Sequence, residues 1–118
     1  MQDLKKRTKQ FAIRIIRMTE SITQNKIGTV ITNQILRSAT SVGANYRAAQ
    51  RGKSSADFVN KLKIVEEELD ETIYWLELIE DTGLLKPELL VNLKSEGDEI
   101  LRMIVSSIKT TRNKIRSS

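Results

Sequence analysis

The chain has 118 residues, of which 30% are charged and 4% aromatic, and it contains neither cysteine nor histidine. Disulfides and thiolate or imidazole metal sites are therefore excluded, as is the commonest general base of enzymes. The length suits one domain over residues 1–118, which we expect to be cytoplasmic and soluble, without a membrane-spanning segment, metal, cofactor or catalytic residue.

Apolar residues at steps of three and four predict a first helix from about Leu4 to Thr23, with Phe11 and Ile15 on its buried face. The same spacing predicts a second helix that begins between Thr23 and Thr29. This helix is expected to end near Gly52, because glycine readily takes the left-handed conformation that follows many helices.

Ser54, followed three residues later by Asp57, indicates the capped start of a third helix, which we expect to end at Thr82 and Gly83. Pro87 marks the first turn of a fourth helix. Because the connections between these helices are short, consecutive helices must run in opposite directions. The sequence therefore predicts an all-α, up-down-up-down antiparallel four-helix bundle.

Charge is divided unevenly along the chain, although the net charge is only +5. Residues 1–63 carry thirteen Lys or Arg against three Asp or Glu, residues 64–101 carry two against twelve, and residues 102–118 carry five against none. Antiparallel packing would gather most of the basic residues at one end of the bundle, and a one-ended cationic surface suits a polyanion. The predicted nucleic-acid-binding residues are Lys5, Lys6, Arg7, Lys9, Arg47, Arg51, Lys53, Lys61, Lys63, Lys109, Arg112, Lys114 and Arg116.

Five carboxylates between Glu66 and Glu71 are the only candidates for acid–base or Mg²⁺ chemistry. The apolar stripe through Val65, Leu69 and Ile73 leaves most of them pointing outward, so we interpret them as a solvated or interface-lining face. No glycine-rich phosphate loop or nucleophile motif is present. The sequence does not indicate an enzyme.

Two helices carry residues suited to close packing or to a subunit interface. The second has small and polar residues at helical spacing, with Gly43 in its interior, where glycine costs about 1 kcal/mol relative to alanine and so suggests close approach to a neighbour. The third has an apolar face beyond the one that a single core requires. The expected packing or interface residues are Gln34, Ser38, Ser41, Asn45, Tyr46, Tyr74, Trp75 and Leu78. Base stacking on Tyr46 and Trp75 is an alternative that the low aromatic content disfavours.

Two stretches of sequence carry a resemblance to a family. They are the stretch QILRSATSVGANYRAA over residues 34–49 and the stretch ETIYWLEL over residues 71–78. Together they resemble the four-helix-bundle proteins encoded in intervening sequences of bacterial 23S ribosomal RNA genes, and the resemblance covers nearly the whole chain. Many close relatives have a proline between the first two helices, where this chain has Thr23, Gln24 and Asn25.

This resemblance implies a bundle that assembles into a ring-like homopentamer, has no known enzymatic activity and is usually suggested to bind nucleic acid. A more distant relative, the accessory protein of diversity-generating retroelements, is similar in fold and works with a reverse transcriptase and RNA. Two functions follow. One is a homo-oligomer that binds RNA or DNA backbones through its basic end. The other is a protein-interaction module that docks a partner enzyme, such as a reverse transcriptase, without touching nucleic acid. A third reading is that the charges only keep the bundle in solution.

Overall fold

The structure is a computed structural model that describes residues 3–117. This part of the chain forms four α-helices and one short 3₁₀ helix, without a β-strand: α1 (Leu4–Thr19), α2 (Lys26–Gln50), α3 (Ser55–Asp81), η1 (Pro87–Leu89) and α4 (Val91–Ser117). The prediction of an all-α fold with four helices is confirmed.

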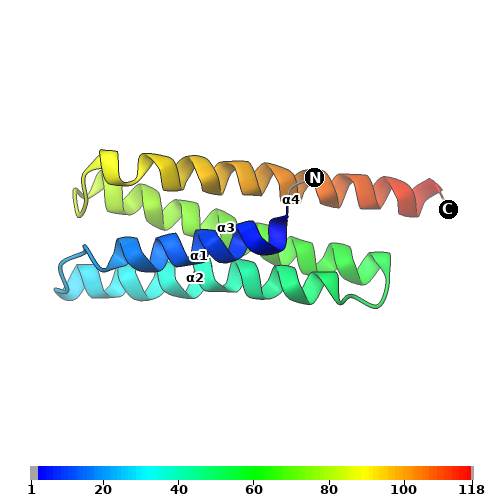
Figure 1. Cartoon of the computed structure of the whole chain (residues 1–118), viewed down its shortest axis with the longest axis horizontal. Helices are drawn as coiled ribbons and strands as arrows, with labels where there is room; N and C mark the ends of the chain where they lie inside the picture. The colour runs from blue at the N-terminus through cyan, green and yellow to red at the C-terminus, as the bar shows by residue number, and fades with distance from the viewer. Residues whose placement is uncertain (1–2, 118) are drawn as a thin grey trace.

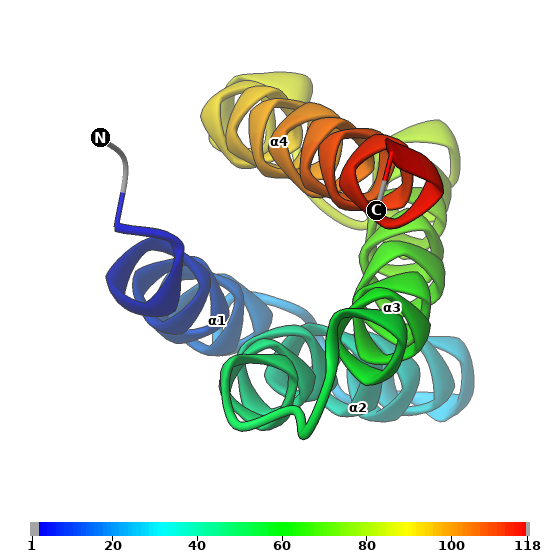
Figure 2. The same ribbon diagram turned by 90° about the vertical axis from the view of Figure 1, so that its right-hand side faces the viewer.

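The helices lie side by side in an elongated body of 53 × 21 × 20 Å, and each runs back along the one before it (Figure 1). The α1–α2 and α3–α4 turns lie at one end, and the α2–α3 turn and the C-terminus lie at the other. Helix α1 is the shortest of the four, and its start lies short of the end that holds the α2–α3 turn and the C-terminus. The most extensive packing joins α2 to α3, whereas α1 and α4 pack least of the four adjacent helix pairs and stand apart at the end seen in Figure 2.

The interior consists of the apolar residues that the three-and-four spacing places on one side of each helix. Phe11 of α1, Ile35 of α2, Leu69 of α3 and Ile104 of α4 are all almost completely buried. They belong to one hydrophobic cluster that runs along the bundle. Burial of each such side chain contributes about 1.5–3 kcal/mol, which outweighs the small differences in helix propensity.

Polar side chains cap the starts of three helices, and at α1 the side chain of Asp3 accepts a hydrogen bond from the N–H of Lys6 at 3.1 Å. Asn25 precedes α2, and its side-chain oxygen accepts a hydrogen bond from the N–H of Gly28 at 2.9 Å. Ser54 caps α3 in the same way, accepting from the N–H of Asp57 at 3.1 Å, as the sequence predicted. An N-cap of this kind stabilises a helix by about 1 kcal/mol. Asn25 therefore marks the start of α2 in a chain that lacks the relatives' proline.

Helix α1 begins at Leu4 as predicted, and α2 and α3 end close to the predicted Gly52 and Thr82, but two other helix ends differ from the sequence prediction. Helix α1 ends at Thr19 rather than near Thr23, because the N–H groups of residues 20–22 bond to carbonyls three residues back and tighten the chain into a turn. Pro87 opens the 3₁₀ helix instead of α4 itself.

The expected left-handed conformation at Gly52 is wrong, since Gly83 is the one residue with positive φ, at 72°, in the part of the chain that the structure describes. Gly52 is needed for space, because a Cβ there would lie 3.0 Å from the carbonyl oxygen of Ala49. Gly43 does lie against α1, but a Cβ at that position would meet Thr8 at an ordinary 3.5 Å, so the contact does not require glycine.

Candidate nucleic-acid-binding surface

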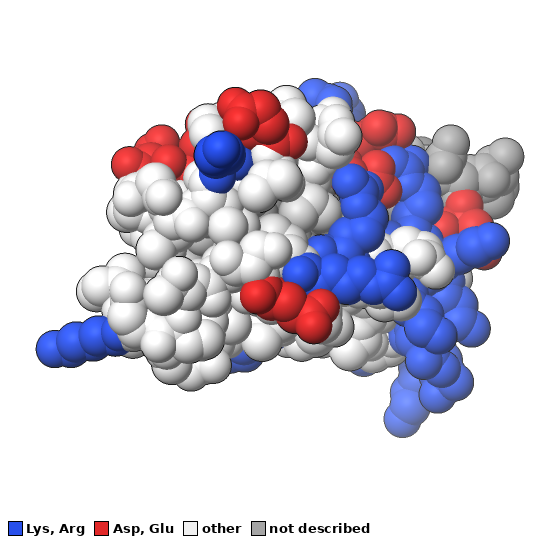
Figure 3. Space-filling model, turned by 60° about the vertical axis from the view of Figure 1, so that its left-hand side comes forward, with Lys and Arg blue, Asp and Glu red and all other residues white. Residues whose placement is uncertain are grey.

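The thirteen predicted basic residues fall on the start of α1, the end of α2, the α2–α3 turn, the first turns of α3 and the last turns of α4. All of these segments lie in the half of the molecule that holds the C-terminus (Figure 1). Figure 3 shows Lys and Arg side chains crowded on one side of the surface, with a broad uncharged area beside them. The basic residues do not all lie at the end of the bundle. The first turn of α1 lies beside Tyr46 of α2, before the α2–α3 turn.

Arg7 differs from the other basic residues because carboxylates of α4 hold it. Its Nη2 donates to Glu96 Oε1 at 2.7 Å and its Nε donates to Glu96 Oε2 at 3.1 Å, while Glu99 lies 3.2 Å from the same guanidinium. The hydrogen bond to Glu96 raises the pKa of Arg7, so its charge is permanent. Arg7 therefore joins α1 to α4 across the least extensive contact between adjacent helices.

Two basic residues of α3 are paired along their own helix. Lys61 donates to both oxygens of Asp57 at 2.8 and 3.0 Å, and Lys63 donates to Glu66 at 3.0 Å. The bond from Lys61, followed by one from the backbone N–H of Lys53, holds the pKa of Asp57 below its ordinary value of 3.8. These pairs reduce the positive charge that α3 presents. The remaining ten of the thirteen have exposed side chains.

Two grooves run between basic segments. The groove between α1 and α2 is lined by Lys5, Lys9 and Arg47 above a floor of small residues. The groove between α3 and α4 is lined by Lys63, Lys109, Arg112 and Arg116, together with the carboxylate of Glu66. Each brings together cations that are far apart in sequence, as an extended polyanion requires.

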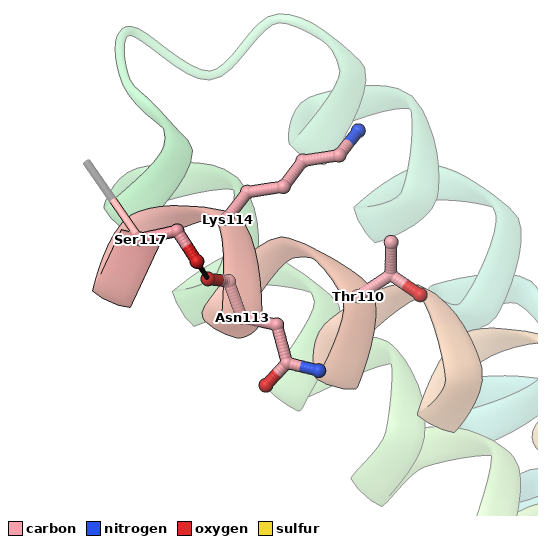
Figure 4. A pocket seen from close by; sticks show the side chains of 4 residues that line it. All are labelled: Thr110, Asn113, Lys114 and Ser117. Carbon is pink, nitrogen blue, oxygen red and sulfur yellow. Dashed lines mark hydrogen bonds between the residues drawn. The ribbon is translucent and has the colours of Figure 1, made fainter.

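A further hollow on the surface of α4 lies among Thr110, Asn113, Lys114 and Ser117. Figure 4 shows that these four side chains come from one helix and that Lys114 extends away from Asn113. The hydroxyl of Ser117 donates to the backbone carbonyl of Asn113 at 2.9 Å. The hollow therefore has no set of converging groups that would fix a ligand.

The predicted packing and interface residues divide into two groups, and those of the first are engaged within the chain. Ser38 is buried and accepts a hydrogen bond from Thr72 of α3 at 2.8 Å. Asn45 donates to the carbonyl of Ser41 one turn earlier. Tyr46 packs against the core, and burial, with the nearby charge of Asp3, raises its pKa.

The second group lies on or near the outer surface of α2 and α3. Tyr74 has 52% of its surface exposed, and its ring meets the edge of Trp75 at a centroid distance of 5.2 Å. Trp75 Nε1 donates to Glu71 at 3.0 Å, and Glu71 also pairs with Arg37 of α2. The other members of this group, Gln34 and Leu78, are half-buried.

Within residues 3–117, Asp and Glu side chains form no group of three or more that could hold a metal ion. None of the helices described is both long and apolar enough to cross a bilayer.

Comparison with protein families gives a match to the 23S rRNA-intervening sequence protein family over residues 2–106. The chain belongs to this family. The resemblance seen in the sequence is thereby confirmed. Comparison with curated proteins gave no match.

Among solved structures, this member of the 23S rRNA-intervening sequence family is similar to a crystal structure from Bacteroides thetaiotaomicron VPI-5482. That structure is described as a protein of unknown function from the S23 ribosomal protein family. The two chains are 38% identical, with a TM-score of 0.85, and the match covers 91% of this chain and 99% of the other. The fold is therefore shared, and the neighbour's description names no ligand.

Sequence reasoning noted the small residues of α2, including Gly43, but did not predict that they form a groove of this family member with Ala12 of α1; the small residues of the groove are Ala12, Thr40, Gly43 and Ala44. The signal is present in the sequence as two stripes, at positions 5, 9 and 12 and at positions 40, 43, 44 and 47. Each stripe follows the steps of three and four that mark one helix face. The pairing of the stripes depends on how α1 and α2 are aligned, which only the structure gives.

Proposed function

We propose that this chain is a non-enzymatic subunit of a homopentamer of up-down-up-down bundles, and that the assembly binds the backbone of RNA or DNA through its basic residues. The supporting observation is that four separate segments of the chain bring exposed Lys and Arg side chains into the same half of the molecule (Figures 1 and 3). Such a surface attracts phosphates without reading bases, and repetition around a ring would multiply weak contacts.

The test measures binding of a fluorescein-labelled mixed-sequence RNA to the full chain by anisotropy at several salt concentrations. Affinity should fall steeply with salt, because each phosphate contact on a single strand contributes about −0.7 to the slope of log K against log salt. Replacing Arg47, Arg51, Arg112 and Arg116 by Glu should abolish binding at physiological salt while the helical circular dichroism spectrum is retained.

A matched control removes the same number of exposed cations outside the predicted set. The residues for this control are Arg14, Arg17, Lys26 and Lys86, each replaced by Glu. This variant has the same net charge as the first variant. If the position of the cations determines binding, the control variant should bind RNA much more tightly than the first variant. Salt-insensitive binding, no binding at low salt, or equal losses in the two variants would overturn the proposal.

The second candidate is a module that docks a partner protein, such as a reverse transcriptase, without nucleic-acid contact. It is favoured by exposed apolar side chains near the α1–α2 and α3–α4 turns, away from the thirteen predicted nucleic-acid-binding residues. Ile27, Val30, Leu89 and Val91 each expose more than half of their surface. Stoichiometric recovery of one protein after nuclease treatment would support this function, whereas crosslinked RNA fragments would support the first.

A further inference from the structure

We propose that the groove between α1 and α2 is the place where a phosphate group of the nucleic-acid backbone sits. The proposal rests on the proposed function and assigns one of its contacts to a defined site. The groove has a volume of about 480 Å³ and lies on the outer surface where α1 and α2 meet. Its rim is formed by Lys5 and Lys9 of α1 and by Arg47 of α2.

The rim places positive charge on both sides of the groove. Lys5 and Lys9 are four residues apart, about 6 Å along α1, so they lie on the same face. Arg47 faces them from α2. A guanidinium binds phosphate through two parallel N–H bonds, and an ammonium adds a point charge with three donors. This combination is suited to a phosphodiester that lies along the groove.

In the part of the chain that the structure describes, no carboxylate pairs with these cations. The residues lining the groove include no Asp or Glu, and within residues 3–117 neither Lys5, Lys9 nor Arg47 forms an ion pair. Cations left without a partner on both sides of a groove repel one another, and an anion between them removes that repulsion. The charge of the groove therefore favours a bound anion.

The floor of the groove gives an anion room to approach. Ala12, Gly43 and Ala44 have at most a methyl group, so no long side chain fills the space between the helices. Thr40 is the one hydroxyl at the groove, and its proton is donated to the carbonyl of Leu36 at 2.7 Å. The groove thus offers charge rather than a pattern of donors, which predicts binding without sequence preference.

The groove between α3 and α4 is a weaker candidate, although it is also basic. Glu66 lies among its cations and accepts a hydrogen bond from Lys63 at 3.0 Å. A bound phosphate would be repelled by that carboxylate at close range. The α1–α2 groove has no such group, and for this reason we assign the phosphate to it.

The first experiment places a carboxylate in the groove. Ala44 is exposed, so Ala44→Glu should be accepted by α2 while its charge repels a phosphate. The matched control, Asn33→Glu, adds the same charge eleven residues earlier, about three turns away on nearly the same helix face. Binding of a fluorescein-labelled twelve-residue oligouridylate should weaken about tenfold in Ala44→Glu and less than about twofold in Asn33→Glu.

The second experiment measures how many phosphates the groove neutralises. Replacing all three rim cations by Gln should reduce the slope of log K against log salt by about 0.7, the value for one neutralised phosphate on a single strand. A matched triple variant removes three exposed cations outside the groove, Arg14, Arg17 and Lys26. This control should leave the slope unchanged.

The outcomes separate the groove from the wider proposal. If the unaltered chain fails to bind oligouridylate at low salt, both the proposed function and the groove are overturned. If it binds but Ala44→Glu and Asn33→Glu weaken binding equally, the groove assignment fails and the proposed function stands. A third outcome concerns competition by poly-glutamate at the same concentration of charge. If poly-glutamate displaces the labelled RNA as effectively as unlabelled oligouridylate does, the groove assignment is overturned, because the result would indicate an acidic protein ligand.

Discussion

Gly28 is the residue at which a side chain is most clearly excluded. A Cβ built there would overlap the carbonyl oxygen of Thr23 and lie 3.2 Å from Cγ2 of Ile22. The loop before α2 could accept a methyl group only by moving, which would also disturb the hydrogen bond from Gly28 to Asn25. We expect Gly28→Ala to lower the free energy of unfolding by about 2 kcal/mol or more in urea denaturation.

Gly43 provides the matched control for this prediction. It also lies within α2, but a Cβ there would have only ordinary contacts, the nearest at 3.5 Å. Alanine is favoured over glycine inside a helix by about 1 kcal/mol. Gly43→Ala should therefore raise the free energy of unfolding by up to this amount. A similar gain of stability in both variants would show that helix propensity, and not the clash with Thr23, governs position 28.

Asp57 should make stability depend on pH in the acid range. Lys61 and the N–H of Lys53 hold its pKa below 3.8 in the folded chain, so its carboxylate stabilises the fold above that value. The contribution is lost as pH falls through the lower, folded-state pKa, because protonation then removes the interactions. The difference in unfolding free energy between the natural chain and Asp57→Asn should be constant near neutral pH and shrink below pH 3.8. A difference that does not change with pH would contradict this assignment.

At the scale of the helices, the contact between α2 and α3 contains a buried polar pair. The hydroxyl of Thr72 donates to Ser38 at 2.8 Å and lies 2.9 Å from the carbonyl of Glu68. Both hydroxyl groups are inaccessible to water. Ser38→Ala and Thr72→Val should each destabilise the chain by about 1 kcal/mol, and the double variant should cost less than the sum by about 0.5–1.5 kcal/mol. If the two single effects add up to that of the double variant, the two hydroxyls contribute to stability independently of each other.

The helices could be predicted from sequence because burial repeats with the helical period, and local capping chemistry marks some of their ends. Ser54 and Asp57 are three residues apart, so the cap of α3 is visible without a structure. The end of α1 was placed too late because Ile22 continues the apolar pattern after the helix has ended and is buried from the turn instead. Space at a glycine, as at Gly28 and Gly52, depends on the path of the neighbouring chain and has no signal in the sequence.

At the scale of the whole molecule, the sequence indicated which segments carry positive charge but not how they are staggered or paired. Short connections fix the direction of consecutive helices, so the basic segments had to lie in one half. The engagement of Arg7 by Glu96 depends on the alignment of α1 with α4, two helices that are not consecutive. The α1–α2 groove likewise depends on alignment, because Lys9 and Arg47 line it together only when their turns are level.

Assembly should depend on the outer surface of α3, where Tyr74 exposes 52% of its area beside Trp75. If this aromatic pair lies between subunits, Tyr74→Asp places a charge in a desolvated contact and should dissociate the oligomer without loss of helicity. For the proposed homopentamer, light scattering after size exclusion should then give a mass that falls from five times 13.5 kDa toward that of one chain. Ile16→Asp is the matched control, since Ile16 is an apolar residue of α1 with 42% exposure. A monomeric natural chain, or equal dissociation in both variants, would exclude α3 as the determining interface.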